Sequence, residues 1–407
     1  SLGADMANKD LKWETTITRN IGVDFGFFNS RLTGTIDAYW NTTKDLLMKT
    51  AIPGITGFTS TYANVGQTSN KGIEIALQGV LVKTRDWNVT AGFNINFNRG
   101  KVDKLADNVT GLYGTEWATS STFPKSDYVL KEGRPVGLVR GLTADGFYTT
   151  DDFTYENGVY ILKEGVADVS SAVFPNYHLH NGMNERPAGQ LAYPGMAKFK
   201  DLNDDGIIND DDVDVIGDMT PVHTGGFNIN ATYKNFDLGL YFNWSYGNEI
   251  YNVNKLAALY GYKEGAVYEN KLSIVKDCYK IYDVVNGELV ALTTPEQLNA
   301  ANANAKLPLA YSENGYVSTL GIEDGSYLRL NTLTLGYTLP KSMLQKAGIS
   351  NLRVYGSIYN VFTITGYSGI DAEVSTSTST KTYPQLGMDW GTYPRARSFV
   401  LGVNLSF

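Results

Sequence analysis

The C-terminal ten residues alternate between apolar and polar side chains up to the last position. Phe399, Leu401, Val403, Leu405 and Phe407 share one face of an extended chain, while Val400, Gly402, Asn404 and Ser406 share the other. Chain ends of soluble proteins are commonly frayed and polar. This segment alone does not distinguish a strand of a membrane β-barrel from a half-buried strand of a soluble sandwich.

The same alternation recurs in segments of about ten residues along the chain. From Trp87 to Phe97 the odd positions are apolar or small, and the even positions are mainly Asn and Thr. From Ile17 to Phe27 and from Phe236 to Trp244 one face is again mainly apolar, and Gly, Asn and Asp are frequent on the other. Polar faces of this kind suit a wet lumen better than a solvated surface rich in Lys and Glu. We therefore predict apolar residues such as Phe93 and Leu240 toward lipid, with Asn94 and Tyr241 in the lumen of a closed barrel.

Nine strands are predicted, and short and long connections alternate between them. The strand ranges are 14–28, 30–44, 70–83, 86–101, 222–234, 236–249, 326–339, 350–363 and 395–407. The long connections are 45–69, 104–221, 250–325 and 364–394. This order is typical of an up-and-down barrel with periplasmic turns at one rim and extracellular loops at the other. The last strand then runs from the extracellular rim to the periplasm.

Composition supports a membrane barrel. The chain has 42 Gly, 27 Tyr, 17 Phe and 6 Trp, with 19% charged residues and a net charge of -8. Aromatic residues suit the two interfacial girdles of a barrel, and the acidic balance argues against nucleic acid as a partner. Cys278 is the single cysteine, so no intrachain disulfide is possible. Because single-chain bacterial barrels have an even number of strands and need export, we expect residues 1–407 to be the C-terminal part of a longer polypeptide.

Several sequence blocks follow one another along the chain: Asp10–Thr16, Asn20–Gly26, Arg31–Tyr39, Asn64–Gly66 with Asn70–Glu74, Glu132–Gly137, Gly195–Asp212, Arg329-Leu330, Asn351–Tyr355 with Asn360–Phe362, and Phe407. In this order they resemble the late barrel of SusC/RagA-type TonB-dependent transporters. The resemblance implies an all-β fold, the C-terminal portion of a 22-stranded antiparallel transmembrane β-barrel with long extracellular loops at 104–221 and 250–325. Plug, TonB box and signal peptide would lie outside this sequence.

The resemblance also implies a function in the outer membrane. The expected activity is TonB-dependent import of oligosaccharides, with a SusD-like surface lipoprotein over the loops and TonB–ExbB–ExbD acting through the missing N-terminal part. Oligopeptide import by the same machinery is the alternative within transport. A passive porin or a surface adhesin is the alternative from another class, and it should lack a plug and a TonB box.

One segment fits a calcium loop. Oxygen-bearing side chains stand at positions 1, 3, 5, 9 and 12 of the pattern, the carbonyl at position 7 and glycine at the turn, Gly206. The predicted ligands are Asp201, Asn203, Asp205, Ile207, Asn209 and Asp212. Hard oxygen ligands favour a structural Ca2+. Asp212 stands where Glu is usual, and the alternative is an Asn- and Asp-rich turn.

No arrangement of residues typical of catalysis is found, so we predict a non-enzymatic protein. His178 and His180 could be imagined as metal ligands, but no third nitrogen or sulfur ligand is near, and an exposed loop pair is favoured. Aromatic residues in or beside the long loops are the expected ligand contacts, because sugars stack on aromatic faces; packing or a girdle position is the alternative for each. The main candidates are Tyr113, Trp117, Tyr246, Tyr251, Trp390 and Tyr393, with Phe123, Tyr260 and Tyr262 beside them.

Overall fold

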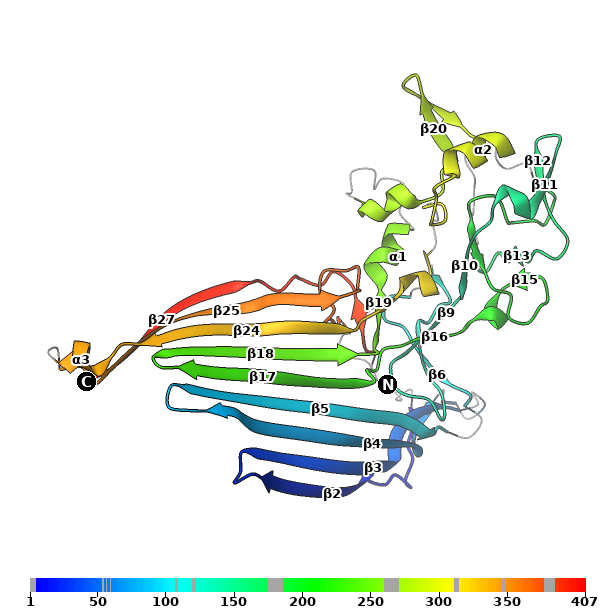
Figure 1. Ribbon diagram of the computed structural model, residues 1–407. Coiled ribbons are helices and arrows are strands. Elements are labelled where there is room, and N and C mark those ends of the chain that lie inside the picture. Colours follow the sequence, from blue (N-terminus) through cyan, green and yellow to red (C-terminus); the bar gives the residue numbers. More distant parts are fainter. Residues whose placement is uncertain are drawn as a thin grey trace.

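The computed structural model describes most of the chain, and its dominant feature is one large antiparallel sheet (Figure 1). The described residues are 5–52, 55, 57–58, 60–106, 109–118, 122–174, 186–259, 271–310, 315–345, 348–376 and 385–407. The sheet's strands, in spatial order, are β2 (Thr15–Phe27), β3 (Leu32–Ala51), β4 (Ser60–Lys83), β5 (Trp87–Lys104), β17 (His223–Tyr233), β18 (Phe236–Tyr246), β24 (Tyr327–Thr338), β25 (Asn351–Thr365) and β27 (Ser398–Ser406). Each long strand pairs with its sequence neighbour in this set, so the predicted strands and their up-and-down order are confirmed.

Cross-strand register sorts the side chains into apolar and polar rows. One row runs across eight strands through Phe25, Gly34, Leu77, Phe93, Phe227, Phe242, Leu330 and Phe362. The adjacent row contains Asp24, Thr35, Ala76, Asn94, Gly226, Asn243, Arg329 and Thr363. Because successive side chains point to opposite faces, the sheet has one apolar and one polar face. This is the arrangement that the alternation predicts.

The apolar face is bounded by aromatic side chains at both ends. On β5 its outward residues extend from Trp87 to Phe97, about 34 Å along the strand at about 3.4 Å per residue. A strand tilted by about 40° then covers roughly the 25 Å apolar band of an outer-membrane barrel. Trp87 contacts Tyr233 at one end, with ring centroids 4.4 Å apart, and Phe97 contacts His223 at the other, at 5.4 Å.

Short turns lie at one end of the sheet and the long connections at the other (Figure 1). Phe28, Asn29 and Ser30 turn the chain between β2 and β3 with positive φ, and the short helix α3 (Lys341–Leu344) lies between β24 and β25. The last strand ends at the short-turn end (Figure 1), as predicted. No helix among the described residues has the length and apolar character needed to cross a membrane.

The prediction that residues 45–69 form a loop is wrong for most of that range. β3 continues to Ala51 and β4 already begins at Ser60, and the two strands remain paired beyond a register shift near Asp45. Asp45 has φ 58°, and the bulge interrupts the alternation from which the strand was predicted. The short strand β1 (Asp5–Met6) pairs in parallel with this extension of β4.

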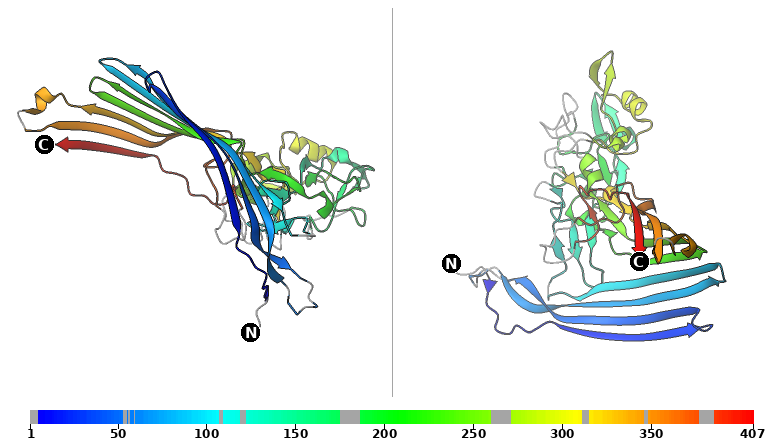
Figure 2. Two further views of the ribbon diagram at one scale, coloured as in Figure 1. Left: turned by 90° about the horizontal axis from the view of Figure 1, so that it is seen from below. Right: turned by 90° about the vertical axis from the view of Figure 1, so that its left-hand side faces the viewer.

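The other long connections build a separate lobe beyond the sheet (Figures 1 and 2). One small sheet joins β6 (Leu112–Gly114), β8 (Tyr128–Leu130), β9 (Leu138–Gly141) and β16 (Asp214–Asp218); another joins β19 (Glu249–Asn252), β23 (Ile322–Asp324) and β26 (Met388–Asp389). Two-stranded pairs are β7 (Thr122–Phe123) with β22 (Gly315–Tyr316), β10 (Ala144–Phe147) with β14 (Ala197–Phe199), β11 (Phe153–Glu156) with β12 (Val159–Leu162), β13 (Asp168–Val169) with β15 (Ile207–Ile208), and β20 (Tyr282–Val285) with β21 (Glu288–Ala291). Helices α1 (Val253–Leu259) and α2 (Pro295–Asn302) complete it.

The lobe has its own apolar core. Tyr148, Phe199 and Tyr316 are buried in one cluster that draws residues from several of the long connections. Tyr128, Tyr251 and Leu256 are buried in a second cluster. Because an apolar core resists unfolding of the segments around it, these connections form a folded unit rather than extended loops.

Candidate functional site on the polar face of the sheet

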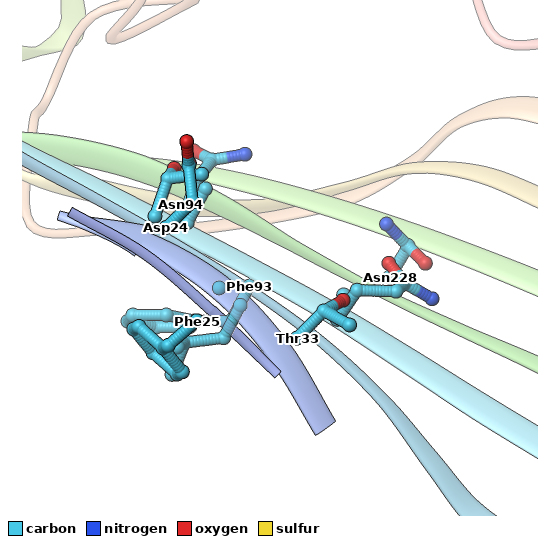
Figure 3. A pocket seen from close by; sticks show the side chains of 12 residues that line it. Asp24, Phe25, Thr33, Phe93, Asn94 and Asn228 are labelled. Carbon is cyan, nitrogen blue, oxygen red and sulfur yellow. The ribbon is translucent and has the colours of Figure 1, made fainter. Parts of the chain in front are cut away.

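The polar face carries a hollow over strands β2, β3, β4, β5 and β17. Its volume is about 430 Å³. Figure 3 shows Phe25 and Phe93 on one side of the sheet, with Asp24, Asn94 and Asn228 on the other. Polar side chains around the hollow are those of Asp24, Thr33, Thr35, Gln78, Asn94 and Asn228. In a barrel, this face is the wall of the lumen.

The hollow exists because small residues stand in the centre of the wall. A Cβ on Gly92 would lie 2.7 Å from Nδ2 of Asn228 and 2.8 Å from Oε1 of Gln78, so both amides reach over this glycine. Asn228 accepts a hydrogen bond from Asn230 at 3.1 Å. Within the described part of the chain, the side chains of Gln78 and Asn94 form no hydrogen bonds, so their amides are free to bind water or a ligand.

A second group of amides and hydroxyls continues the wall on β17, β18 and β24. Tyr241 donates to Asn230 at 3.2 Å, and Asn331 donates to Asn243 at 2.8 Å. Asn243 in turn donates to the hydroxyl of Tyr327 at 3.2 Å. Uncharged hydrogen-bonding groups therefore line the polar face over several strands.

Near the short-turn end, the wall holds a bidentate ion pair. Arg353 on β25 donates to Asp237 on β18 through Nε at 2.9 Å and Nη2 at 2.5 Å. Gly336 on the intervening strand leaves the space that these side chains occupy, since its Cβ would lie 2.5 Å from Oδ1 of Asp237. No local pattern in the sequence predicts this group, because only the cross-strand register brings the three residues together.

At the long-loop end, buried Arg329 joins the wall to the connection between β25 and β27. Its guanidinium pairs with Asp371, donates to Glu373 at 3.1 Å, and donates from Nε to Thr363 at 2.9 Å. Arg395 pairs with both carboxylates, at 3.4 Å to Asp371 and 2.9 Å to Glu373. Two cations and two anions thus hold residues 371–373 against the polar face. Arg329 was identified from sequence only as part of a motif.

The aromatic ligand candidates lie in different parts of the molecule. Tyr113 is exposed on β6 with the Arg140 guanidinium 4.8 Å from its ring centre. Trp390 and Tyr393 are exposed on the segment before β27, with Tyr393 88% exposed. Tyr260 and Tyr262 lie outside the described residues, as do His178 and His180.

The positions of three of these candidates favour packing or a girdle position over ligand contact. Tyr251 is 0% exposed and packs in the lobe core against Trp117, which is partly buried, at 6.4 Å between ring centroids. Phe123 is also buried in the lobe. Tyr246 stacks on His223 at 5.0 Å and belongs by register to the outward face. Burial indicates a packing role for Tyr251, and the register of Tyr246 indicates a position in the interfacial girdle.

Backbone N–H groups of the segment Asp201–Asp212 donate hydrogen bonds to its own side-chain carboxylates. Asp201 accepts from the N–H of Gly206 at 2.7 Å, and Gly206 has φ +84°. Asp212 is 0% exposed and accepts from the N–H groups of Leu202 at 2.7 Å and Asn209 at 2.8 Å. Among the described residues, no three His, Cys, Asp or Glu side chains are placed to share a metal ion. Calcium binding stays a prediction.

Comparison with known proteins shows which family this chain is similar to. Residues 2–183 match the family described as "TonB dependent receptor-like, beta-barrel". TonB-dependent receptor P3 of Formosa agariphila is 30% identical over 99% of this chain and 35% of its own length. TonB-dependent receptor SusC of Bacteroides thetaiotaomicron is 29% identical over 98% of the chain and 32% of its own length.

A solved structure, that of the RagAB peptide transporter, has a TM-score of 0.68 at 25% identity, covering 99% of this chain and 36% of that one. The chain spans about a third of the length of the curated relatives that it matches. The predicted resemblance, the barrel fold and the outer-membrane location are confirmed.

Proposed function

We propose that this chain, which carries part of the outer-membrane β-barrel of a SusC/RagA-type TonB-dependent receptor, serves the import of oligosaccharides. The polar face around Asn94 and Asn228 is the observation that carries the proposal. Amides and hydroxyls exchange hydrogen bonds readily with hydroxyl-rich, uncharged molecules, and free side chains such as Gln78 and Asn94 leave capacity for them. The relative SusC supports TonB-dependent energy coupling.

The partner proposed for the long-loop end is a SusD-like lipoprotein. The lobe built from residues 104–221 and 250–325 is large, folded and confined to one end of the sheet (Figure 1). A folded surface of this kind offers a preorganised docking face, whereas disordered loops would have to be ordered on binding. The solved structure that resembles this chain is named the RagAB peptide transporter, and a paired name of this kind supports a second protein that acts with the barrel.

Oligopeptide import is the second candidate, and a specific observation favours it. Asp24, Asp37 and Glu74 place three carboxylates on the polar face of β2, β3 and β4. These groups would attract the ammonium groups of a peptide, and RagAB is named as a peptide transporter. The relatives named as TonB-dependent receptors support active transport rather than a passive porin or an adhesin.

Uptake by the full-length protein separates these proposals. A deletion strain carrying the gene on a plasmid would be grown on single oligosaccharides and on single oligopeptides, with and without TonB. Growth on oligosaccharides that needs both gene and TonB supports the first proposal, and growth on peptides alone supports the second. The double variant Asn94→Leu/Asn228→Leu should slow uptake about tenfold, while Phe93→Leu on the outer face should not. Uptake that survives TonB loss contradicts active transport.

We further propose that the Asp201–Asp212 segment binds a structural Ca2+. Asp201 accepts from the N–H groups of Asp205 and Gly206, and Asp205 accepts from the N–H of Ile207, so these two carboxylates lie in one turn, where a cation would relieve their repulsion. Calorimetry on the full-length protein should detect Ca2+ binding that Asp201→Ala/Asp205→Ala abolishes. Asp283→Asn, on a hairpin elsewhere in the lobe, is the matched control. Hydrogen exchange near Asp210 that is the same with Ca2+ and with chelator would contradict the proposal.

A further inference from the structure

A row of three cationic side chains and one Trp lies on the outward face of β2, β3, β4 and β5. Register places Arg19 opposite Trp40, Trp40 opposite Lys71, and Lys71 opposite Arg99. We refer to these four residues as the outer cation row. All four are exposed, and Trp40 is 41% exposed. Neighbouring strands are about 4.8 Å apart, so long Lys and Arg side chains in this row can reach a common ligand.

Charge is completely segregated between the two faces of this part of the sheet. In the ranges 15–27, 32–44, 69–79 and 87–101, every Lys and Arg is on the outward face and every Asp and Glu is on the polar face. The cations are Arg19, Lys44, Lys71, Arg99 and Lys101; the acids are Asp24, Asp37 and Glu74. The outward cations therefore have no carboxylate on their own face within these ranges.

The three cations of the row also form no ion pair with a carboxylate elsewhere in the described part of the chain. Within the described residues, Arg19 and Lys71 form no ion pair, whereas Lys101 pairs with Asp103 at 3.1 Å. Arg99 donates from Nη1 to the carbonyl oxygens of Asn98 at 2.9 Å and Pro221 at 2.7 Å, which orients the guanidinium without neutralising it. Like charges directly opposite each other, such as Lys71 and Arg99, destabilise a strand pair unless an anion lies between them.

The row lies where the apolar band ends. The neighbouring row toward the short-turn end is Ile21, Ala38, Ile73 and Phe97, which is wholly apolar. One step further toward the long loops, the outward positions are occupied by Arg19, Trp40, Lys71 and Arg99. A Trp among cations at the edge of the band is typical of the membrane interface, where lipid headgroups replace acyl chains.

We propose that the outer cation row binds the phosphate groups of an anionic lipid in the extracellular leaflet. Arg19 and Arg99 offer planar donor pairs to phosphate oxygens, Lys71 offers a compact charge, and Trp40 packs against the lipid's glycerol or sugar region. The bound lipid would neutralise this edge of the barrel at the level where the lobe begins. The proposal rests on the outer-membrane location of the barrel and is independent of the transported substrate.

The experiment uses the full-length protein purified in a nonionic detergent, labelled and titrated by thermophoresis with mixed micelles of lipid A that carries two phosphates. Each removed cation should weaken binding about fivefold, and the variant Arg19→Gln/Lys71→Gln/Arg99→Gln about 100-fold. The matched control Lys83→Gln/Arg85→Gln/Lys234→Gln removes three exposed cations near the short-turn end and should change the affinity less than about threefold. Binding by the unaltered protein should also weaken as salt rises.

Several outcomes would overturn the proposal. They are unchanged affinity of the triple variant, an equal loss in the control, or equal binding of lipid A and zwitterionic phosphatidylethanolamine. The gel shift of the unheated, folded barrel verifies that each variant folds. If the triple variant does not fold, the single variants Arg19→Gln, Lys71→Gln and Arg99→Gln decide the matter, because each should still lose about fivefold.

Discussion

The side-chain amide of Asn64 pairs with the backbone of Lys12 as a neighbouring strand would. Its Oδ1 accepts from the N–H of Lys12 at 2.8 Å, and its Nδ2 donates to the carbonyl of Lys12 at 2.8 Å. The same Nδ2 donates to the carbonyl of Asp45 at 2.8 Å, at the bulge in β3. One side chain thus joins the segment before β2 to the extension of the β3–β4 hairpin.

Replacing Asn64 with Leu should loosen this segment. The variant removes both bonds to Lys12 and leaves its backbone groups to water, at a cost of about 1–2 kcal/mol in local stability. Hydrogen exchange at the Lys12 amide should accelerate about tenfold, whereas exchange in β17 should not change. Asn64→Asp keeps the acceptor for the Lys12 N–H but sets a carboxylate oxygen against the carbonyl oxygens of Lys12 and Asp45, so it should also accelerate exchange. Equal exchange in all three proteins would contradict this role.

The two faces of β5 should respond differently to charge. Phe93→Arg places a cation on the lipid-facing side near the middle of the apolar band and should destabilise the barrel by about 2–4 kcal/mol. Asn94→Arg places it on the polar face and should be milder. Urea unfolding of the full-length protein in lipid vesicles measures both. A larger loss for Asn94→Arg would reverse the assignment of the faces.

A side chain at Gly336 should displace Asp237 and Arg353, because these two side chains meet over this residue. Gly336→Ala would push a Cβ against both members of the pair and should cost about 1–3 kcal/mol. The matched control is Gly356→Ala on the next strand, whose Cβ would make its closest contact at 3.4 Å, an ordinary distance. Thermal unfolding of the two variants should differ by several degrees. Similar melting temperatures would indicate that the ion pair moves aside without cost.

Acidification should weaken the contact between Glu323 in the lobe and Ser368 in the connection between β25 and β26. Burial opposes the charge of Glu323, but the N–H and O–H of Ser368 and the ammonium of Lys255 outweigh it and lower the pKa of this carboxyl below its ordinary 4.5. A lowered pKa in the folded state means that the contribution is present above pH 4.5 and is lost as pH falls through the folded value. Hydrogen exchange at the Ser368 amide, corrected for its intrinsic pH dependence, should accelerate over that interval. Glu323→Gln should remove the dependence, and a dependence that persists in this variant would assign it to another group.

The sequence by itself determined the nine long strands, apart from the extension of β3 and β4 beyond the bulge at Asp45, together with their order and the direction of each face. A period of two in apolar residues is a local property, and burial in lipid demands it at every outward position from Trp87 to Phe97. The alternation of short and long connections likewise follows from chain order alone. These features needed no knowledge of which residues meet across strands.

Only the tertiary structure decided which side chains meet. The outer cation row, the pair of Asp237 with Arg353 over Gly336, and the hollow around Gly92 depend on strand register, which the bulges near Asp45 and between Tyr241 and Phe242 shift. The lobe's core, where Tyr251 is buried, joins segments far apart in the chain that have no periodic pattern. Local patterns predict which face of the sheet a side chain occupies. Binding sites depend instead on contacts between residues that are distant in sequence, and tertiary packing determines those contacts.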